Sequence, residues 1–290
     1  AVIDLLDTLE EGRADERLTA LRALRDEILT NSSIHLRRNT ARVLVQIMKQ
    51  LVRERGNPLR QVQLAHDFMA ASSGRPTVIR RELKTYHLLE MPEVWNQVAF
   101  DHHVHDATTK GRKSPTHLIM DAWIKGIRNL TVIYYNFIRR ETAAELTEAA
   151  EIMGVTVRVG IELSARFRGK FAQFIWAPRG FLDRQHFLDF LDEPQVQAFF
   201  AKGREVSNHR TAYVLALLQS FNTHHLQSMN QAYGLDVAPL TEAAFLEFVG
   251  VGQPAVAHLA EYIHHLALPA MRTRVEQLRA RYAAADPGEE

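Results

Sequence analysis

The sequence predicts an α/β protein that is preceded by an all-helical N-terminal domain. Two observations indicate this division. Through the first 95 residues, apolar side chains recur at three- and four-residue spacing, which is the period of a helix. After residue 95, two β-branched runs of strand length, 129–135 and 155–163, alternate with helical segments. That alternation is typical of parallel strands joined by helices.

The N-terminal region, 1–95, predicts a helical hairpin or a small bundle. Glycine, proline, serine and asparagine interrupt its helical pattern at Gly12 and at 31–33, 56–58 and 72–76. Each interruption is short. We therefore expect consecutive helices to be antiparallel neighbours.

Basic residues are concentrated in part of this region. Between Leu36 and Lys84 there are eleven lysines and arginines and three acidic residues, a local excess of eight positive charges. The eleven are Arg37, Arg38, Arg42, Lys49, Arg53, Arg55, Arg60, Arg75, Arg80, Arg81 and Lys84. A face of this kind could attract nucleic acid or another polyanion. The alternative is that these side chains solvate the outside of the bundle or pair with acidic neighbours.

Helix signals separate the predicted strands. Ser114-Pro115 combines a capping residue with proline at the first helical position, and Gly126 ends that helix. A second helix is predicted from about residue 140 to Met153, with Gly154 as its end. Strand, helix, strand, helix, strand in about 65 residues predicts a right-handed unit with parallel strands.

The segment 101–106, Asp-His-His-Val-His-Asp, lies directly after an apolar run. Because side chains alternate along a strand, His103 and His105 are expected to point the same way. Imidazole nitrogens bind Zn, Fe, Mn and Ni. Ligands gather at the carboxyl ends of parallel strands, so Glu162 and the stretch 134–136 are expected at the same rim.

Composition excludes several kinds of site. The 290-residue chain has no cysteine, which excludes disulfides, thiolate zinc sites, iron–sulfur clusters and cysteine nucleophiles. Any metal must be held by His, Asp, Glu or Asn. No apolar run reaches the length of a membrane span, so we expect a cytoplasmic protein with no membrane partner. The sequence begins with Ala1, so either the initiator was removed or the chain is a piece of a longer protein.

From Phe100 to Ala165 the sequence resembles the PHP family, the metal-dependent phosphoesterase domains named for polymerase and histidinol phosphatase. The family's Asp-x-His-x-His motif is matched by Asp101, His103 and His105. Its Gly-Ile-Glu-Ile-Ser motif is matched by 160–164, Gly-Ile-Glu-Leu-Ser, and its Ser-Pro helix start by 114–115. A weaker resemblance, to the branch acting on nucleotides and short RNA, continues through 222–234 and 251–254.

Four positions depart from the family pattern. Lys110, Tyr135, Gln173 and Ala255 stand where the family has an aspartate and three histidines. The resemblance implies an incomplete or diverged PHP-type β/α barrel over 96–290. It also implies a helical insertion at about 182–265 and a C-terminal helix, with the basic helical domain over 1–95.

The resemblance also implies what the domain does. It predicts a hydrolase or phosphoesterase-type domain, with a degenerate metal site, for a phosphorylated small molecule or nucleotide. His103, His105 and Glu162 would hold at most one divalent ion (Mn, Zn or Fe), or the site would hold none. Asp101 and Lys110 are the catalytic candidates, and Lys110, Arg166 and Arg168 are the candidates for phosphate binding. The alternatives are a non-catalytic pseudoenzyme or scaffold that binds nucleic acid or a protein through Arg37 to Lys84, and an unrelated β/α protein.

Overall fold

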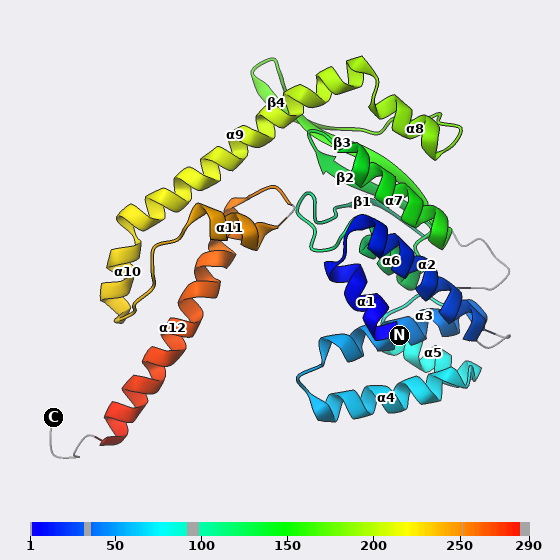
Figure 1. Ribbon diagram of the computed structural model, residues 1–290, viewed down its shortest axis with the longest axis horizontal. Coiled ribbons are helices and arrows are strands. Elements are labelled where there is room, and N and C mark those ends of the chain that lie inside the picture. Colours follow the sequence, from blue (N-terminus) through cyan, green and yellow to red (C-terminus); the bar gives the residue numbers. More distant parts are fainter. Residues whose placement is uncertain (1, 32–35, 92–98, 251, 285–290) are drawn as a thin grey trace. The chain divides into compact units, whose positions relative to one another are not determined.

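The computed structural model of the protein describes residues 2–31, 36–91, 99–250 and 252–284 (Figure 1). The chain divides into two compact units, Ala1–Ala201 and Lys202–Glu290. The first unit contains the sheet and the residues of the candidate site. The described residues of the second unit form helices that are joined by loops.

A four-stranded sheet forms the centre of the first unit. Its strands are β1 (Phe100–Val104), β2 (Asn129–Tyr135), β3 (Thr156–Phe167) and β4 (Lys170–Trp176), in the order β1-β2-β3-β4. The strands β1, β2 and β3 are parallel, and β4 runs antiparallel to β3. The predicted α/β class is therefore confirmed, and among the described strands the sheet is open, with β1 and β4 at its edges.

Two helices connect the parallel strands, and the predicted caps define both. The helix α6 (Pro115–Lys125) begins after Ser114, whose side chain accepts a hydrogen bond from the backbone N–H of His117. Gly126, with φ of 82°, ends it. The helix α7 (Arg140–Met153) ends at Gly154, with φ of 64°. A left-handed residue after the last turn suits glycine because it has no Cβ.

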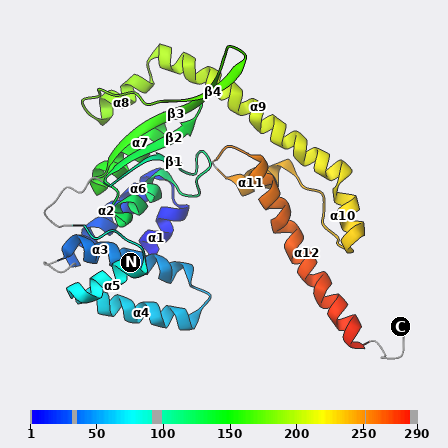
Figure 2. The ribbon, with the colours of Figure 1, turned by 180° about the vertical axis from the view of Figure 1, so that it is seen from behind.

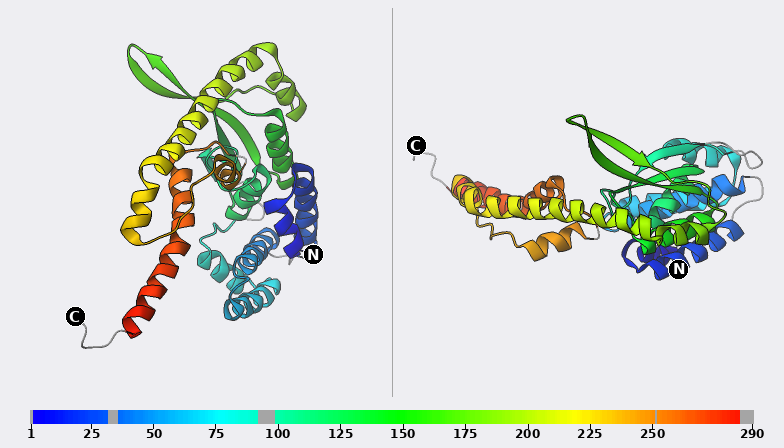
Figure 3. Two further views of the ribbon diagram at one scale, coloured as in Figure 1. Left: turned by 60° about the vertical axis from the view of Figure 1, so that its left-hand side comes forward. Right: turned by 90° about the horizontal axis from the view of Figure 1, so that it is seen from above.

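The strand β3 is longer than predicted and continues to Phe167. It joins β4 through a two-residue turn in which Arg168 and Gly169 both have positive φ, 50° and 79°. Such a turn matches the right-handed twist of a hairpin. The β3–β4 hairpin extends beyond the other strands (Figure 3).

In the described residues before the sheet there are five helices: α1 (Val2–Glu11), α2 (Ala14–Asn31), α3 (Arg37–Arg53), α4 (Pro58–Ser72) and α5 (Pro76–Thr85). The interruptions predicted at Gly12, 56–58 and 72–76 separate them as expected. The interruption at 31–33 falls partly outside the described residues. Val98, in the apolar run before the histidines, and the predicted boundary near residue 95 also lie outside the described residues.

One hydrophobic core includes both the first two helices and the sheet. Leu9 of α1 and Leu21 of α2 are fully buried in the same cluster as Leu146 of α7 and Val132 of β2. The helix α2 packs against α6 and α7, which carry the sheet connections (Figure 2). A smaller cluster lies among α3, α4 and α5. The N-terminal helices α1 and α2 thus belong to the compact unit that contains the sheet.

The C-terminal region is helical, as predicted for 182–265. It contains α8 (Arg184–Leu191), α9 (Pro194–His224), α10 (Leu226–Tyr233), α11 (Glu242–Val249) and α12 (Val256–Ala284). The C-terminal helix, α12, begins at Val256, inside the predicted insertion, and Leu259 and Tyr262 of its first turns pack in the core of the second unit. Within the described chain, we find no helix with the length and apolarity of a membrane span.

Candidate metal centre

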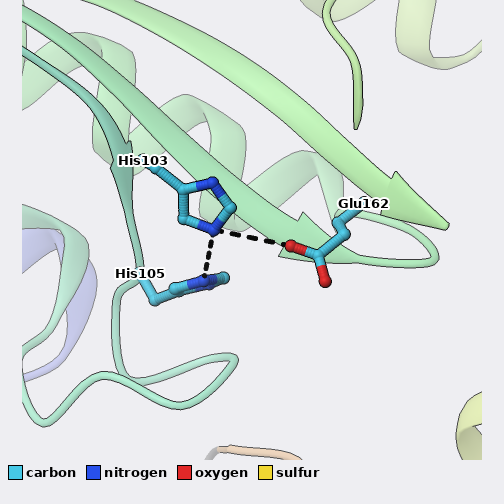
Figure 4. Close-up of side chains that lie close together, drawn as sticks. All are labelled: His103, His105 and Glu162. Atoms are coloured by element: carbon cyan, nitrogen blue, oxygen red, sulfur yellow. Dashed lines mark hydrogen bonds and ion pairs between the residues drawn. The ribbon is translucent and has the colours of Figure 1, made fainter. Parts of the chain in front are cut away.

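Two parallel strands bring three potential metal ligands together. His103 lies in β1, His105 follows the end of β1, and Glu162 lies in β3 (Figure 4). One ligand atom of each lies within 4.8 Å of the others, at the carboxyl ends of the strands. Between Asp101 and Val104 the register of β1 against β2 shifts, so the pairing of the two strands is irregular within the histidine segment. Irregular pairing of this kind re-aims side chains next to functional sites.

The distances between these atoms fit the geometry of a small divalent ion. The Nε2 atoms of His103 and His105 are 3.2 Å apart, and Nε2 of His103 is 3.5 Å from Oε2 of Glu162. In a tetrahedral zinc site with bonds of about 2.1 Å, neighbouring ligand atoms are about 3.4 Å apart. These two separations therefore already match those of a bound metal.

The environment of His105 leaves its Nε2 atom free of a proton. Its Nδ1 lies 2.9 Å from the carbonyl oxygen of Ile133, so Nδ1 carries the hydrogen and donates it. Fixing one ring nitrogen in this way orients the other as a ligand. Burial lowers the pKa of His105, and the nearby ammonium of Lys110 lowers it further. Neutral imidazole is the form that binds a metal.

The backbone of Gly111, in the loop after His105, lies very close to the backbone of His105 and Asp106. Gly111 donates its backbone N–H to the carbonyl oxygen of Asp106, at 2.8 Å. A Cβ at position 111 would lie 2.2 Å from the carbonyl oxygen of His105 and 2.7 Å from the carbonyl carbon of Asp106. Only glycine permits this approach. The sequence pattern identified Lys110 as a departure from a family motif and gave no sign of the contact that Gly111 makes.

Asp106, the last residue of the histidine segment, is buried and belongs to the support of the site. Its carboxylate accepts hydrogen bonds from the hydroxyl of Tyr134 and from the backbone N–H and hydroxyl of Thr108. Burial raises the pKa of Asp106. The aspartate thus ties the loop to β2 and does not reach the ligand group.

Glu162 is held by two contacts that the sequence did not predict. Gln173 of β4 donates its amide N–H to Oε1 of Glu162 at 2.5 Å. The backbone N–H of Asn136 donates to the carbonyl oxygen of Glu162 at 2.9 Å. Asn136 adopts a positive φ of 66°, a conformation that asparagine tolerates better than most residues. The carboxylate therefore presents Oε2 toward His103.

Lys110 and Tyr135 lie beside the centre. The ammonium of Lys110 is 5.6 Å from the centroid of the Tyr135 ring, and that ring is 5.1 Å from the ring of His105. A hydrogen bond to Tyr135 raises the pKa of Lys110, which is exposed to solvent and therefore charged. Asp101 accepts a hydrogen bond from the backbone N–H of His103 at 3.2 Å and lies outside the group of three ligands.

The two arginine candidates lie farther along the β3–β4 hairpin. Arg166 pairs with Phe171 and shares the face of β3 that carries Glu162, four residues and roughly 13 Å away. Arg168 is in the hairpin turn, with its guanidinium 5.2 Å from the ring of Phe167. Both remain predictions as phosphate ligands.

Several of the eleven basic residues between Leu36 and Lys84 make contacts inside the unit. Arg42 is buried and donates to the carbonyl oxygens of Ile124 and Leu89. Lys49 forms a buried ion pair with Asp121. Ion pairs involve three more of them: Arg55 with Asp7, Arg80 with Glu90, and Arg81 with the buried carboxylate of Glu82. The predicted basic face is thus partly occupied by internal contacts.

The chain has few recognisable relatives among known proteins. No protein-family model matches the chain, and no curated protein matches it. Among solved structures, it is similar to a crystal structure from Bifidobacterium adolescentis that is provisionally named a metal-dependent phosphoesterase. The two sequences are 17% identical, the TM-score is 0.40, and the match covers 60% of this chain and 52% of that chain. A similarity at this level shows neither the family nor the function of this chain.

Proposed function

We propose that the chain is a PHP-like domain that holds one divalent ion at His103, His105 and Glu162 and acts on a phosphorylated substrate such as a nucleotide. The observation that carries the proposal is the convergence of these three side chains within 4.8 Å. Two imidazoles and one carboxylate make a donor set that binds zinc, iron or manganese and leaves coordination positions open.

The residues around the centre have separate roles in this proposal. An ion held there would supply Lewis-acid chemistry, which polarises a phosphoryl oxygen and makes water more acidic. The ammonium of Lys110 would bind a phosphate oxygen as a point charge. Asp101, through its hydrogen bond to the backbone of His103, would position that ligand. Arg166 and Arg168 would meet a more distant phosphate of an extended substrate.

The reaction of this class is hydrolysis of a phosphoester. Oxygen of a water molecule forms a bond to phosphorus, the bond from phosphorus to the ester oxygen breaks, and the leaving oxygen takes up a proton. Only one ligand group is present in the described part of the chain. The domain would therefore work without the two-ion clamp that stabilises both the attacking and the leaving oxygen.

Hydrolysis of bis(p-nitrophenyl) phosphate and p-nitrophenyl phosphate tests the proposal. The metal-free chain is compared before and after addition of Mn²⁺, Zn²⁺ or Fe²⁺. We expect metal-dependent release of p-nitrophenol that His103→Ala and Glu162→Gln abolish and that His209→Ala, an exposed histidine in the second unit, leaves unchanged. Turnover that is equal in all variants would overturn the proposal.

A second candidate is a non-catalytic domain that binds a metal and a phosphorylated ligand. The contact that favours it is the hydrogen bond from Gln173 to Glu162, because it occupies one oxygen of the only carboxylate in the ligand group. The same experiment separates the two candidates. Stoichiometric metal binding that depends on His103, with no hydrolysis of either ester, is the result that selects the non-catalytic domain.

A further inference from the structure

The C-terminal half of α12, in the second unit, carries apolar side chains that belong to none of the hydrophobic clusters of the described chain. The first half of this helix packs in the core of the unit, whose last apolar residue along α12 is Leu266. Farther along, four apolar side chains have between 42% and 87% of their surface exposed: Met271, Val275, Leu278 and Tyr282. We call these four residues the α12 seam. The last turns of α12 extend beyond α11 (Figure 1).

The spacing of the α12 seam is that of a coiled coil. Its residues follow one another at intervals of four, three and four positions, which is the alternation of d and a positions in a heptad. Val275, Leu278 and Tyr282, together with Arg279, line a shallow groove of about 460 Å³. In a coiled coil, a side chain of the facing helix inserts into a hole formed by four residues. The groove has the composition of such a hole.

The exposed part of α12 lacks the packing that normally stabilises a helix. Most of the stability of helices in proteins comes from burial of an apolar face, and isolated helices shorter than about 12–15 residues are marginal in water. The segment from Met271 to Ala284 adds no residue to the described cores. A second helix on the α12 seam would supply this packing.

Arginines flank the α12 seam on both sides. In the same heptad register, Arg272 and Arg279 occupy e positions, and Arg274 and Arg281 occupy g positions. Arg274 lies against the end of α10, since its Nε would be 3.0 Å from a Cβ on Gly234. The other three arginines are exposed, and none of them forms an ion pair or hydrogen bond with the described residues. Charges at e and g positions set the choice of partner in coiled coils.

These arginines disfavour a second copy of the chain as the partner. In a parallel pair of helices, g positions face e positions, and in an antiparallel pair each kind faces its own. Two copies of α12 would therefore place arginine against arginine in either orientation, and like charges suppress a pairing. We infer that the α12 seam docks an acidic amphipathic helix of a partner protein, whose Glu or Asp side chains meet the arginines. This surface is independent of the metal centre and of the function proposed for it.

Two synthetic peptides test the inference on the full chain. Both are three heptads long, with Ile at a and Leu at d, and they carry Glu or Lys at every e and g position. Anisotropy of a labelled peptide measures binding. We expect the Glu peptide to bind with a Kd of about 1–100 µM and the Lys peptide to bind at least about tenfold more weakly. Binding of the Glu peptide should weaken severalfold between about 50 and 500 mM salt, because exposed charges are screened.

Variants of α12 locate the interaction. Leu278→Ser removes a seam side chain and should weaken binding of the Glu peptide about tenfold or more. The double variant Arg279→Gln with Arg281→Gln should weaken it about threefold or more, as expected for two exposed ion pairs. The matched controls lie away from the seam: Ala280→Ser, and Gln277→Glu with Ala280→Glu, which changes the net charge as the arginine pair does. These controls should bind within about twofold of the parent chain. Circular dichroism melting curves show that each variant is folded.

The other possible occupants give different results. No binding of the Glu peptide, equal binding of both peptides, or binding that Leu278→Ser leaves unchanged would overturn the inference. Sedimentation of the chain alone tests the second copy, and self-association that Leu278→Ser abolishes would also overturn it. The acidic residues that follow α12 in the sequence are tested by neutralising Asp286, Glu289 and Glu290 together. Peptide binding should stay unchanged, and a gain of about tenfold or more would assign the seam to the chain's own tail instead.

Discussion

Replacing Gly111 by alanine tests how the metal centre is supported. The added Cβ would lie 2.2 Å from the carbonyl oxygen of His105 and within 2.8 Å of the carbonyl group of Asp106. All of these atoms are backbone, so no side chain can rotate away. Restoring a normal contact of about 3.2 Å requires the loop and the His105 backbone to separate by about 1 Å. Metal-ligand bonds tolerate about 0.2 Å, so the ligand group loses its geometry.

We therefore expect Gly111→Ala to weaken Zn²⁺ binding about 10- to 100-fold, the usual loss when the support of a ligand is disturbed. The free energy of unfolding should fall by about 1–3 kcal/mol, as for other overpacked positions. Calorimetry with Zn²⁺ and urea unfolding measure the two effects. Gly56→Ala is the matched control, because a Cβ there meets no atom within 4 Å. If both variants bind Zn²⁺ and unfold as the parent chain does, the close backbone contact at Gly111 does not support the metal centre.

Three further perturbations have expected outcomes. Tyr134→Phe removes a donor from buried Asp106 and should lower the free energy of unfolding by about 1–3 kcal/mol in urea titrations. Burial, and then the charges of Lys49 and its neighbours, lower the pKa of His117 to about 3. As the pH falls from 6.5 to 3, the unfolded chain binds a proton at His117 before the folded chain does, so the free energy of unfolding falls by about 1.4 kcal/mol per pH unit. Urea unfolding at several pH values should show that His117→Gln removes this part of the pH dependence. Lys110→Gln should weaken phosphate binding to the metal-loaded chain severalfold in calorimetry. The matched controls, all exposed, are Tyr213→Phe, His209→Gln and Lys170→Gln. Equal effects in variant and control would contradict the corresponding prediction.

Local signals in the sequence were sufficient for much of the sheet and its connections. Ser114, Gly126 and Gly154 mark helix ends through hydrogen bonds and backbone conformations within a few residues. These local features do not depend on what the helix packs against. The β-branched run over 129–135 became β2 without change. The pairing of His103 with His105 followed from their spacing and from their position at the end of a strand.

The support of the metal centre depends on contacts between distant segments, which no local pattern encodes. The carbonyl oxygen of Ile133 meets His105 because β1 pairs with β2, whose residues lie about 28 positions farther along the chain. Gln173 reaches Glu162 because β4 folds back along β3. The basic residues of α3 also illustrate this limit. Lys49 is buried because tertiary packing places α3 against α6, the helix that carries Asp121. The basic pattern of α3 alone cannot show which helix packs there.

Metal content is the measurement that tests the central claim most directly. The purified chain is stripped of metal, incubated with Zn²⁺ or Mn²⁺, freed of excess ion and analysed by mass spectrometry. We expect about one equivalent per chain, reduced below about 0.2 in His103→Ala, His105→Ala and Glu162→Gln, because two remaining ligands hold an ion weakly. His209→Ala should retain the full equivalent. An equal metal content in all variants, or no bound metal in the parent chain, would contradict the assignment of this centre.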